Sequence, residues 1–590
     1  MKTKEPSGTA NQVINGIGVS TGIAIGPAYV VEPALGSVPE YSIARSGIGR
    51  EIERFRAAAK AARAQIAKLR KRAQELPRNA GDDLLLLLEA HAGMVSSARL
   101  TSGVETRIHE RGINAEAAVQ DWVHALAAAF SAMEDPYLAA RAEDIRDVGR
   151  RLLLQLTDRQ YTAFTSLPRG CVVVAEELSP ADTALMDPAM IAGLVTTLGG
   201  TDSHTAIMAR SLALPAALGV QGIIPVVRAG DPIIVDGDAG TVIIHPDAQT
   251  LAEYRRRIEA RRRLNRQLKR LRDLPAVTRD QVQVTLEANL ELPRDAAAAR
   301  QAGAEGVGLL RTEFLFMNRP DLPSEDEQYR ALADIIDALD GRPVTIRTLD
   351  VGGEKLATSL GDRIAAGPNP ALGLRAIRLA LQEPALMETQ LAAIMRASAH
   401  GPVRILLPMI SSIRQIRQVR QILAKVVRRL RRRKVKMAHP LPPLGVMIEV
   451  PAAAINADSL AREVDFFAIG TNDLTMYCLA IDRGDDQVAD LYDPLHPAVL
   501  RLIQHTVDAA HRSGIPVSVC GEVAGNARIV PLLIGMGLRQ LSMTPNSLPR
   551  VKQRIRQLDA AIAARRAQGI LDQSEETQIA TLLDEFIDAL

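Results

Sequence analysis

Length, composition and charge place this chain among multidomain globular proteins, since 590 residues exceed what one hydrophobic core serves and three or four domains are expected. With 47% hydrophobic residues, 24% charged residues and a net charge of +3, the chain has no strong overall field, and its 3% aromatic content argues against a stacking surface for single-stranded nucleic acid. Three cysteines without a CxxC pair predict no disulfide framework and a reducing, cytoplasmic location.

The N-terminal part reads as short strands followed by a helical segment. Met1 to Gln12 lacks the apolar core of a signal peptide, and no uncharged apolar run is long enough to cross a bilayer. Residues 14–34 are β-like runs punctuated by glycine. From about 46 to 157, apolar residues recur every three or four positions, as in Ile52, Phe55, Ala59, Ala62, Ile66 and Leu69. This pattern predicts a helical bundle, either as a packing scaffold or with an exposed groove for a partner.

Strands return between about 160 and 248, and a basic helix follows them. The strand candidates are Cys171–Ala175, Gly193–Thr197, Pro232–Val235 and Thr241–Ile244. We expect the N-terminal run to join them, which makes the helical segment an insertion. Residues 250–272 predict a connecting helix whose arginines form a solvated face in preference to a nucleic-acid surface, and the basic run from Arg428 to Lys436 is interpreted in the same way.

His204 is displayed in an unusual way. An apolar run ends in Gly199 and Gly200, a polar turn follows, and a helical pattern begins after His204. An imidazole at such a place can bind metal, move protons or carry a phosphoryl group. The metal interpretation is weak because no second His or Cys stands at ligand spacing nearby. By local sequence alone an ordinary surface or core histidine is more frequent, so the rest of the chain must decide.

From about residue 280 onward, strands alternate with helical stretches. Eight strand candidates in roughly 310 residues are the number and size expected of a (β/α)₈ barrel. They are Val282–Leu286, Gly306–Leu310, Val344–Leu349, Arg404–Pro408, Leu444–Glu449, Phe466–Ile469, Val517–Cys520 and Gln540–Met543.

Charged and polar residues gather at the carboxyl ends of these strands, where such barrels hold their active sites. Arginine cannot shed its charge, so several arginines on one mouth predict a small substrate with phosphate and carboxylate groups. Glu449 and Asp473 at adjacent strand ends suit magnesium, and the Cys520 thiol can donate or take a proton. The polar groups at these ends include Arg311, Thr312, Glu313, Arg347, Asp350, Glu449, Asn472, Asp473, Cys520 and Glu522, with Arg375 and Arg483 in nearby loops.

Specific motifs make the chain resemble enzyme I of the bacterial phosphotransferase system, the phosphoenolpyruvate–protein phosphotransferase family. The resemblance runs from about residue 14 to 590. Its motifs are Gly-Gly-x-x-Ser-His-Thr-x-Ile-Met-Ala-Arg at 199–210, Gly-Leu-Leu-Arg-Thr-Glu-Phe-Leu-Phe at 308–316, Arg-Thr-Leu-Asp-Val-Gly-Gly-Glu-Lys at 347–355, Ile-Gly-Thr-Asn-Asp-Leu-Thr at 469–475 and Cys-Gly-Glu at 520–522.

The resemblance implies a multidomain α/β fold and a two-step phosphoryl transfer. It implies that phosphoenolpyruvate phosphorylates His204 at Nε2, that pyruvate leaves, and that the phosphocarrier protein HPr then receives the phosphoryl group. Implied roles are nucleophile for His204, proton donor for Cys520, hydrogen bonding to the histidine for Thr183, substrate binding for Arg311, Arg347, Asn472, Asp473 and Arg483, and Mg²⁺ binding for Glu449 and Asp473. Implied domains are a phosphohistidine α/β domain (14–45 with 158–248), an inserted helical subdomain that docks HPr (46–157), a linker helix (249–274) and a TIM barrel (275–590) through which the family dimerises.

One departure and three alternatives accompany this expectation. The family usually has threonine directly before Ser-His, whereas this chain has Asp202, whose charge would raise the pKa of His204 and repel an incoming phosphoryl group. Pyruvate phosphate dikinase and phosphoenolpyruvate synthase need an ATP-binding domain for which no segment remains. The nitrogen-regulatory paralogue, without its N-terminal sensor domain, stays open. A regulatory protein without turnover has only Asp202 in its favour.

Overall fold

The computed structural model of the chain divides into two compact units, residues 1–261 and 262–590, each described here by itself. The structure describes residues 11–31, 39–73, 88–131, 136–157, 167–178, 186, 189–200, 203–212, 214–293, 295–316, 321–351, 369, 371–482, 488 and 491–590.

The first unit contains an eight-stranded mixed sheet with the order β1-β8-β7-β3-β4-β5-β6-β2. Strands β3 to β6 run parallel and the outer pairs are antiparallel. The pairing of Ala28 with Val172 brings the N-terminal run beside the later strands, as expected. The strands are β1 Gln12–Asn15, β2 Ile17–Ser20, β3 Ile23–Val30, β4 Cys171–Ala175, β5 Ile191–Thr196, β6 Ala216–Leu218, β7 Pro232–Asp236 and β8 Thr241–Ile244.

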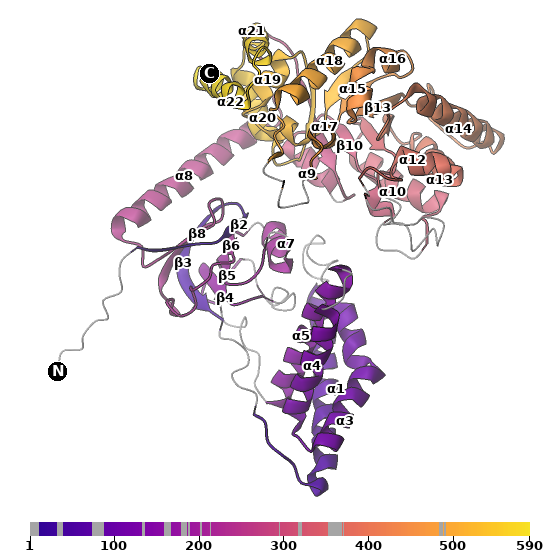
Figure 1. The fold of residues 1–590 in the computed structure, drawn as a ribbon. Helices are drawn as coiled ribbons and strands as arrows, with labels where there is room; N and C mark the ends of the chain where they lie inside the picture. The colour runs from indigo at the N-terminus through magenta and orange to yellow at the C-terminus, as the bar shows by residue number, and fades with distance from the viewer. Residues whose placement is uncertain are drawn as a thin grey trace. The chain divides into compact units, whose positions relative to one another are not determined.

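Between β3 and β4 the chain forms a helical bundle with its own core (Figure 1). Phe55, Leu100 and Leu152 are fully buried in it. The predicted apolar face of the first helix is buried from Phe55 to Leu69, and Ile52 packs at its edge. The described elements are η1 Arg45–Gly47, α1 Ile48–Ala73, α3 Ala98–Arg111, α4 Ala115–Ser131 and α5 Pro136–Leu156.

Two further helices complete this part of the chain. Helix α7, His204–Ser211, begins where the sequence predicted, because the Ser203 hydroxyl accepts a hydrogen bond from the N–H of Ala206 (3.3 Å) and so caps the helix. Helix α8, Ala248–Arg270, lies where the sequence predicted a helix over residues 250–272. Arg257 on α8 pairs with the buried Asp236 of β7 at 2.7 Å.

The second unit is a closed barrel of eight parallel strands. Its strands are β9 Thr285–Leu290, β10 Val307–Leu310, β11 Val344–Arg347, β12 Val403–Leu407, β13 Leu444–Ile448, β14 Phe467–Ile469, β15 Val517–Val519 and β16 Gln540–Met543. The described helices are α9 Asp295–Ala302, η2 Glu313–Leu315, α10 Glu325–Ala338, α12 Ile377–Gln382, α13 Pro384–Ala397, α14 Ile413–Arg432, α15 Pro451–Ile455, α16 Ala457–Ala461, α17 Thr471–Leu479, α18 Pro497–Ser513, η5 Glu522–Gly525, α19 Val530–Gly535, α20 Leu548–Gln557, α21 Ala560–Leu571 and α22 Glu576–Asp588. The expected multidomain α/β fold with a C-terminal barrel is therefore confirmed.

Two strand predictions need correction. The first barrel strand was expected at Val282–Leu286 but runs over β9, because residues 278–282 form a turn in which Val282 donates its N–H to the Thr278 hydroxyl at 2.9 Å. The charged Glu287 interrupts the apolar run of this strand, so a search for apolar runs did not find its second half. Glu287 is nevertheless buried, because Arg404 pairs with its carboxylate at 2.5 Å. Strand β6 was not predicted, because a three-residue Ala-Ala-Leu strand has no distinctive pattern. None of the described helices is long and apolar enough to cross a membrane.

Candidate active site

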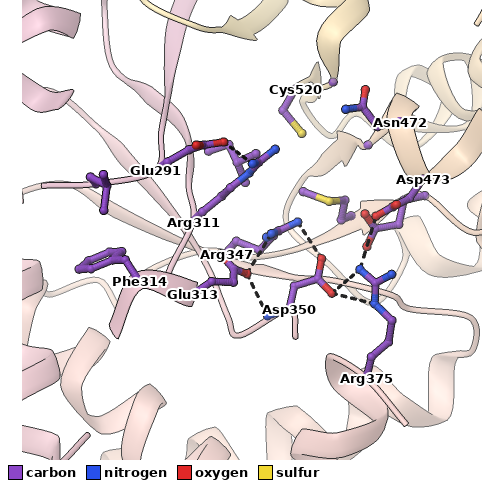
Figure 2. Close-up of a pocket in the computed structure, with 16 residues that line it drawn as sticks. Glu291, Arg311, Glu313, Phe314, Arg347, Asp350, Arg375, Asn472, Asp473 and Cys520 are labelled. Carbon is purple, nitrogen blue, oxygen red and sulfur yellow. Dashed lines mark hydrogen bonds and ion pairs between the residues drawn. The ribbon is translucent and has the colours of Figure 1, made fainter. Parts of the chain in front are cut away.

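A cavity of about 500 Å³ opens at the carboxyl ends of the barrel strands. Figure 2 shows that its polar side chains come from several strand ends and point toward one space. Six residues to which the sequence analysis assigned a role line it together: Arg311, Arg347, Glu449, Asn472, Asp473 and Cys520. The structure thus brings these residues together as expected from their strand-end positions.

The arginines of the cavity are paired with carboxylates (Figure 2). Arg347 lies 2.9 Å from both Glu313 and Asp350, and Arg375 lies 2.8 Å from Asp350. Burial opposes ionisation of Asp350, but the adjacent Arg347 and Arg375 outweigh it and lower the pKa of this carboxyl. Arg311 makes its own pair with Glu291. The cavity therefore presents guanidinium groups that stay charged and are oriented by acidic neighbours.

Three carboxylates gather on one side of the cavity. Asp350, Glu449 and Asp473 each place an oxygen within 4.8 Å of the others. Glu449 is almost fully buried, and its Oε1 accepts the N–H of Met409 at 2.6 Å. Burial, together with the charges of Asp350 and Asp473, raises the pKa of Glu449 well above its ordinary value. A cation between these hard oxygen donors would relieve this repulsion, so the donor set fits a small divalent metal ion.

Cys520 lies at the boundary between this polar cavity and an apolar layer of the barrel interior. It packs with Leu309, Met447 and Phe466, and its Sγ lies 3.6 Å from the carbonyl oxygen of Ile469. Burial is the main cause that raises the pKa of the Cys520 thiol to about 12, with a smaller contribution from the charge of Glu449. The group is therefore a neutral thiol at physiological pH and is able to act as a proton donor.

Two glycines allow the loops at the strand ends to approach closely. A Cβ at position 470 would lie 2.9 Å from Glu449 Oε2, and one at 521 would lie 1.9 Å from the Thr471 hydroxyl. At this contact Asn472 donates its amide N–H to Glu522 Oε1 (2.9 Å) and accepts the Glu522 N–H at Oδ1 (3.0 Å). The loops after β14 and β15 are thereby joined beside Cys520.

Several site residues had no role in the sequence prediction. Asp350 and Arg375 were noted near strand ends, but only the structure shows that Asp350 bridges two arginines and joins the carboxylate cluster. Glu291 was missed altogether because the boundary of the first strand was placed too early. An acidic residue directly after a corrected β9 is the signal that could have found it.

Some predicted residues have no described side chain. The backbone of His204 is described at the start of α7, whereas its side chain and the whole of Thr183, Asp202 and Arg483 lie outside the described residues. Gly352 to Lys355, which complete one of the motifs, also lie outside them. The roles expected for these residues remain predictions.

Comparison with known proteins finds similar sequences over most of the chain. Family models match residues 15–141 (PEP-utilising enzyme, N-terminal), 167–240 (PEP-utilising enzyme, mobile domain) and 265–560 (PEP-utilising enzyme, PEP-binding domain). A phosphoenolpyruvate-protein phosphotransferase of Cupriavidus necator is 46% identical over 552 residues, which cover 92% of this chain and 94% of the relative. One from Bacillus sp. is 38% identical over 95% of this chain and 96% of the relative.

A solved structure is also similar to part of the chain. The solution structure titled Enzyme I (nEIt) is 35% identical, covers 42% of this chain and 99% of that one, and superposes with a TM-score of 0.37. The three family models and the two long, highly similar relatives suffice to place the protein: the chain belongs to the PEP-utilising enzymes, in the enzyme I family of phosphoenolpyruvate-protein phosphotransferases.

Proposed function

We propose that the chain transfers the phosphoryl group of phosphoenolpyruvate to Nε2 of His204, releases pyruvate, and passes the phosphoryl group to an HPr-type carrier protein. One observation supports this most directly. Arginines, a cluster of three carboxylates and a buried neutral thiol line the same cavity at the barrel mouth. A phosphorylated enol acid needs all three, because it is polyanionic, coordinates metal through phosphoryl oxygen, and yields an enolate that must be protonated.

The arginines and the asparagine would hold the substrate. Arg311, Arg347 and Arg375 present guanidiniums to its phosphate and carboxylate, and Arg483 is proposed to join them. The Asn472 amide keeps one N–H beyond the one that it donates to Glu522. Because Arg347 and Arg375 are oriented by largely buried acidic neighbours, these two donors are positioned before the substrate arrives, which lowers the cost of reorganisation.

Glu449 and Asp473 are proposed to hold Mg²⁺, with Asp350 beside them as a third oxygen donor. When bound, Mg²⁺ supplies polarisation of the phosphoryl oxygens and neutralises charge that develops on them. Members of this family are metal-dependent, and the oxygen-only donor set favours magnesium over softer metals.

In the proposed reaction, His204 is the nucleophile and Cys520 is the proton donor. The bond between phosphorus and the enol oxygen breaks as a bond forms between phosphorus and Nε2 of His204. The electron pair left on the enol oxygen forms the ketone, and the enolate C3 takes the proton of the Cys520 thiol. Pyruvate leaves, and the Cys520 thiolate regains a proton from solvent because its raised pKa favours the neutral form.

Four further assignments belong to the same proposal. The helical segment 46–157 would dock the carrier, and the barrel would form the contact of a homodimer. The proposed domains are 14–45 with 158–248, 46–157, 249–274 and 275–590. A Cys520 that must stay a free thiol supports a reducing, cytoplasmic location.

Incubation with ³²P-labelled phosphoenolpyruvate and Mg²⁺, without ATP, tests the reaction. Acid-labile label is expected on His204, and added HPr-type carrier should remove it. The matched variant His204→Ala should take up no label. Wild-type protein that stays unlabelled, or equal labelling of the variant, would exclude the proposed function.

A further inference from the structure

The turn that carries Cys520 is held from two sides. On one side the N–H of Cys520 donates to the carbonyl of Ile469 at 3.1 Å, which extends the pairing of β15 with β14. On the other side the carbonyl of Cys520 accepts a hydrogen bond from Nδ2 of Asn289 at 2.9 Å. The proposed reaction assigns no role to Asn289.

Asn289 makes this contact from a strand that does not neighbour β15. It lies on β9, and β16 stands between β9 and β15 in the barrel. Ser542 on β16 donates its hydroxyl to Oδ1 of Asn289 at 2.6 Å. The carbonyl of Cys520 can only accept a hydrogen bond, so the Nδ2 end of the Asn289 amide must face it. The Ser542 hydroxyl, which donates to Oδ1, holds the amide in this orientation. One side-chain relay therefore joins three strands at Cys520.

The surroundings of Asn289 argue against simple packing. Its neighbours Ala288 and Leu290 on β9 are fully buried apolar residues, whereas Asn289 borders a second cavity of about 780 Å³. This cavity adjoins the first and shares with it Glu291, Arg311, Asn472, Cys520 and Gly521. An apolar residue would fill such a place without needing partners. The amide instead uses both of its ends in hydrogen bonds.

We propose that Asn289, oriented by Ser542, is a positioning residue that holds the Cys520 thiol against the methylene carbon of the substrate. This inference rests on the proposed function. Proton transfer from sulfur to carbon needs close and directed approach, and a displacement of about 1 Å costs on the order of 100-fold in rate. The proton moves from Sγ to C3, and the thiolate that remains is reprotonated by water. If Cys520 is displaced, the enolate escapes and is protonated in solution on either face.

The stereochemistry of the product tests the proposal. Phosphoenolpyruvate that carries one deuterium at C3 in a defined geometry is converted in tritiated water by wild type and by Asn289→Ala. Wild type should make pyruvate with a chiral methyl group, and the variant should make largely racemic methyl while its initial rate of His204 phosphorylation stays within about twofold. Asn546→Ala removes another asparagine of the second cavity and should behave as wild type.

The three cysteines provide a second readout that does not depend on turnover. Asn289→Ala should raise the alkylation rate of Cys520 by about tenfold or more while Cys171 and Cys478 react as in wild type. Ser542→Ala should act in the same direction with a smaller effect, because the amide loses its orientation but keeps its donor. A general loosening of the barrel unit would also raise the alkylation rate of Cys478, which lies on α17 in that unit, and would contradict a positioning role.

Different results would contradict the proposed function and the proposed role of Asn289. Unlabelled His204 in wild-type protein would exclude the proposed function whatever Asn289 does. If wild type is labelled but Asn289→Ala still yields chiral methyl pyruvate and a protected Cys520, the function stands and the role of Asn289 is excluded.

Discussion

At the scale of single residues, the arginines of the cavity already have partners. Arg347 pairs with Glu313, Arg375 pairs with Asp350, and Arg311 pairs with Glu291. The first two pairs are largely buried, so they orient the guanidiniums without exposing them to water. The side chain of Glu291 is 66% exposed, so its pair with Arg311 is the one that a phosphate or carboxylate ligand most directly competes with.

Removing the charge of Glu291 should therefore improve substrate binding. An exposed ion pair contributes up to about 1 kcal/mol, so Glu291→Gln is expected to lower the KM for phosphoenolpyruvate about two- to fivefold. The assay is the initial rate of His204 labelling at varied substrate concentration. Glu585→Gln, on the outer helix α22, is the matched control and should leave KM unchanged. An unchanged or higher KM in Glu291→Gln would show that this carboxylate supports binding.

The thiol of Cys520 leads to a prediction about pH. Burial raises the pKa of this thiol to about 12. The thiol is therefore fully protonated at neutral pH and loses its proton only as the pH rises toward that value. We expect that Cys520 protonates the enolate equally well between pH 6 and 9, measured as the chirality of the pyruvate methyl group across that range. A loss of chirality above about pH 8 would indicate an ordinary thiol pKa instead.

At the scale of elements, helix α8 shows how a strongly basic segment is accommodated. Arg257 reaches the buried carboxylate of Asp236, and Arg261 pairs with Asp238 in the turn after β7. These contacts attach the first part of the helix to the sheet of the first unit. At the other end, the buried Lys552 of α20 donates to the carbonyl of Arg272 at 2.7 Å, within the barrel unit. Two of the arginines of this helix thus have specific carboxylate partners in the first unit.

The pair between Arg257 and Asp236 should matter for stability. Arg257→Ala removes the partner of a carboxylate that is almost fully buried, although two backbone N–H groups still donate to Asp236. We expect a loss of about 1–2 kcal/mol in the free energy of unfolding of the first unit, measured by denaturant titration. Arg255→Ala, an exposed residue of the same helix, is the control and should change stability by less than about 0.5 kcal/mol. Equal effects of the two variants would contradict this role.

At the scale of the whole molecule, the chain contains separate hydrophobic cores. The barrel has one large core, the helical bundle has another, and the mixed sheet contributes two layers on its faces. Because the proposed substrate and metal residues whose side chains are described all lie in the barrel unit, ligand binding should stabilise that unit selectively.

Calorimetry should therefore show a shift that is confined to one transition. With Mg²⁺ present, phosphoenolpyruvate at about 100 times its Kd adds about 2.7 kcal/mol, which corresponds to a rise of about 4 °C for a barrel of this size. Removal of the metal with EDTA should reverse the shift, and Glu449→Gln should abolish the part that depends on Mg²⁺. A ligand-induced shift in every transition would show that the units unfold together.

The fold was largely accessible from sequence, for reasons visible in particular elements. Strands such as β4 and β8 were predicted at their observed bounds because apolar runs between turn residues have a local signature. Strand β9 was placed too early because the polar Glu287 interrupts its pattern, and its burial depends on Arg404 from a distant strand. Strand β6 is too short to carry any signature.

The sequence by itself determined the order of the elements, the family and the convergence of Arg311, Arg347, Glu449, Asn472, Asp473 and Cys520, because parallel strands bring their ends to one mouth. Only the tertiary structure decided which of these charges pair, that Asp350 joins the carboxylate cluster, and that Asn289 reaches Cys520 past an intervening strand. Such contacts join residues far apart in the chain at distances of about 3 Å, and residue spacing carries no information about them.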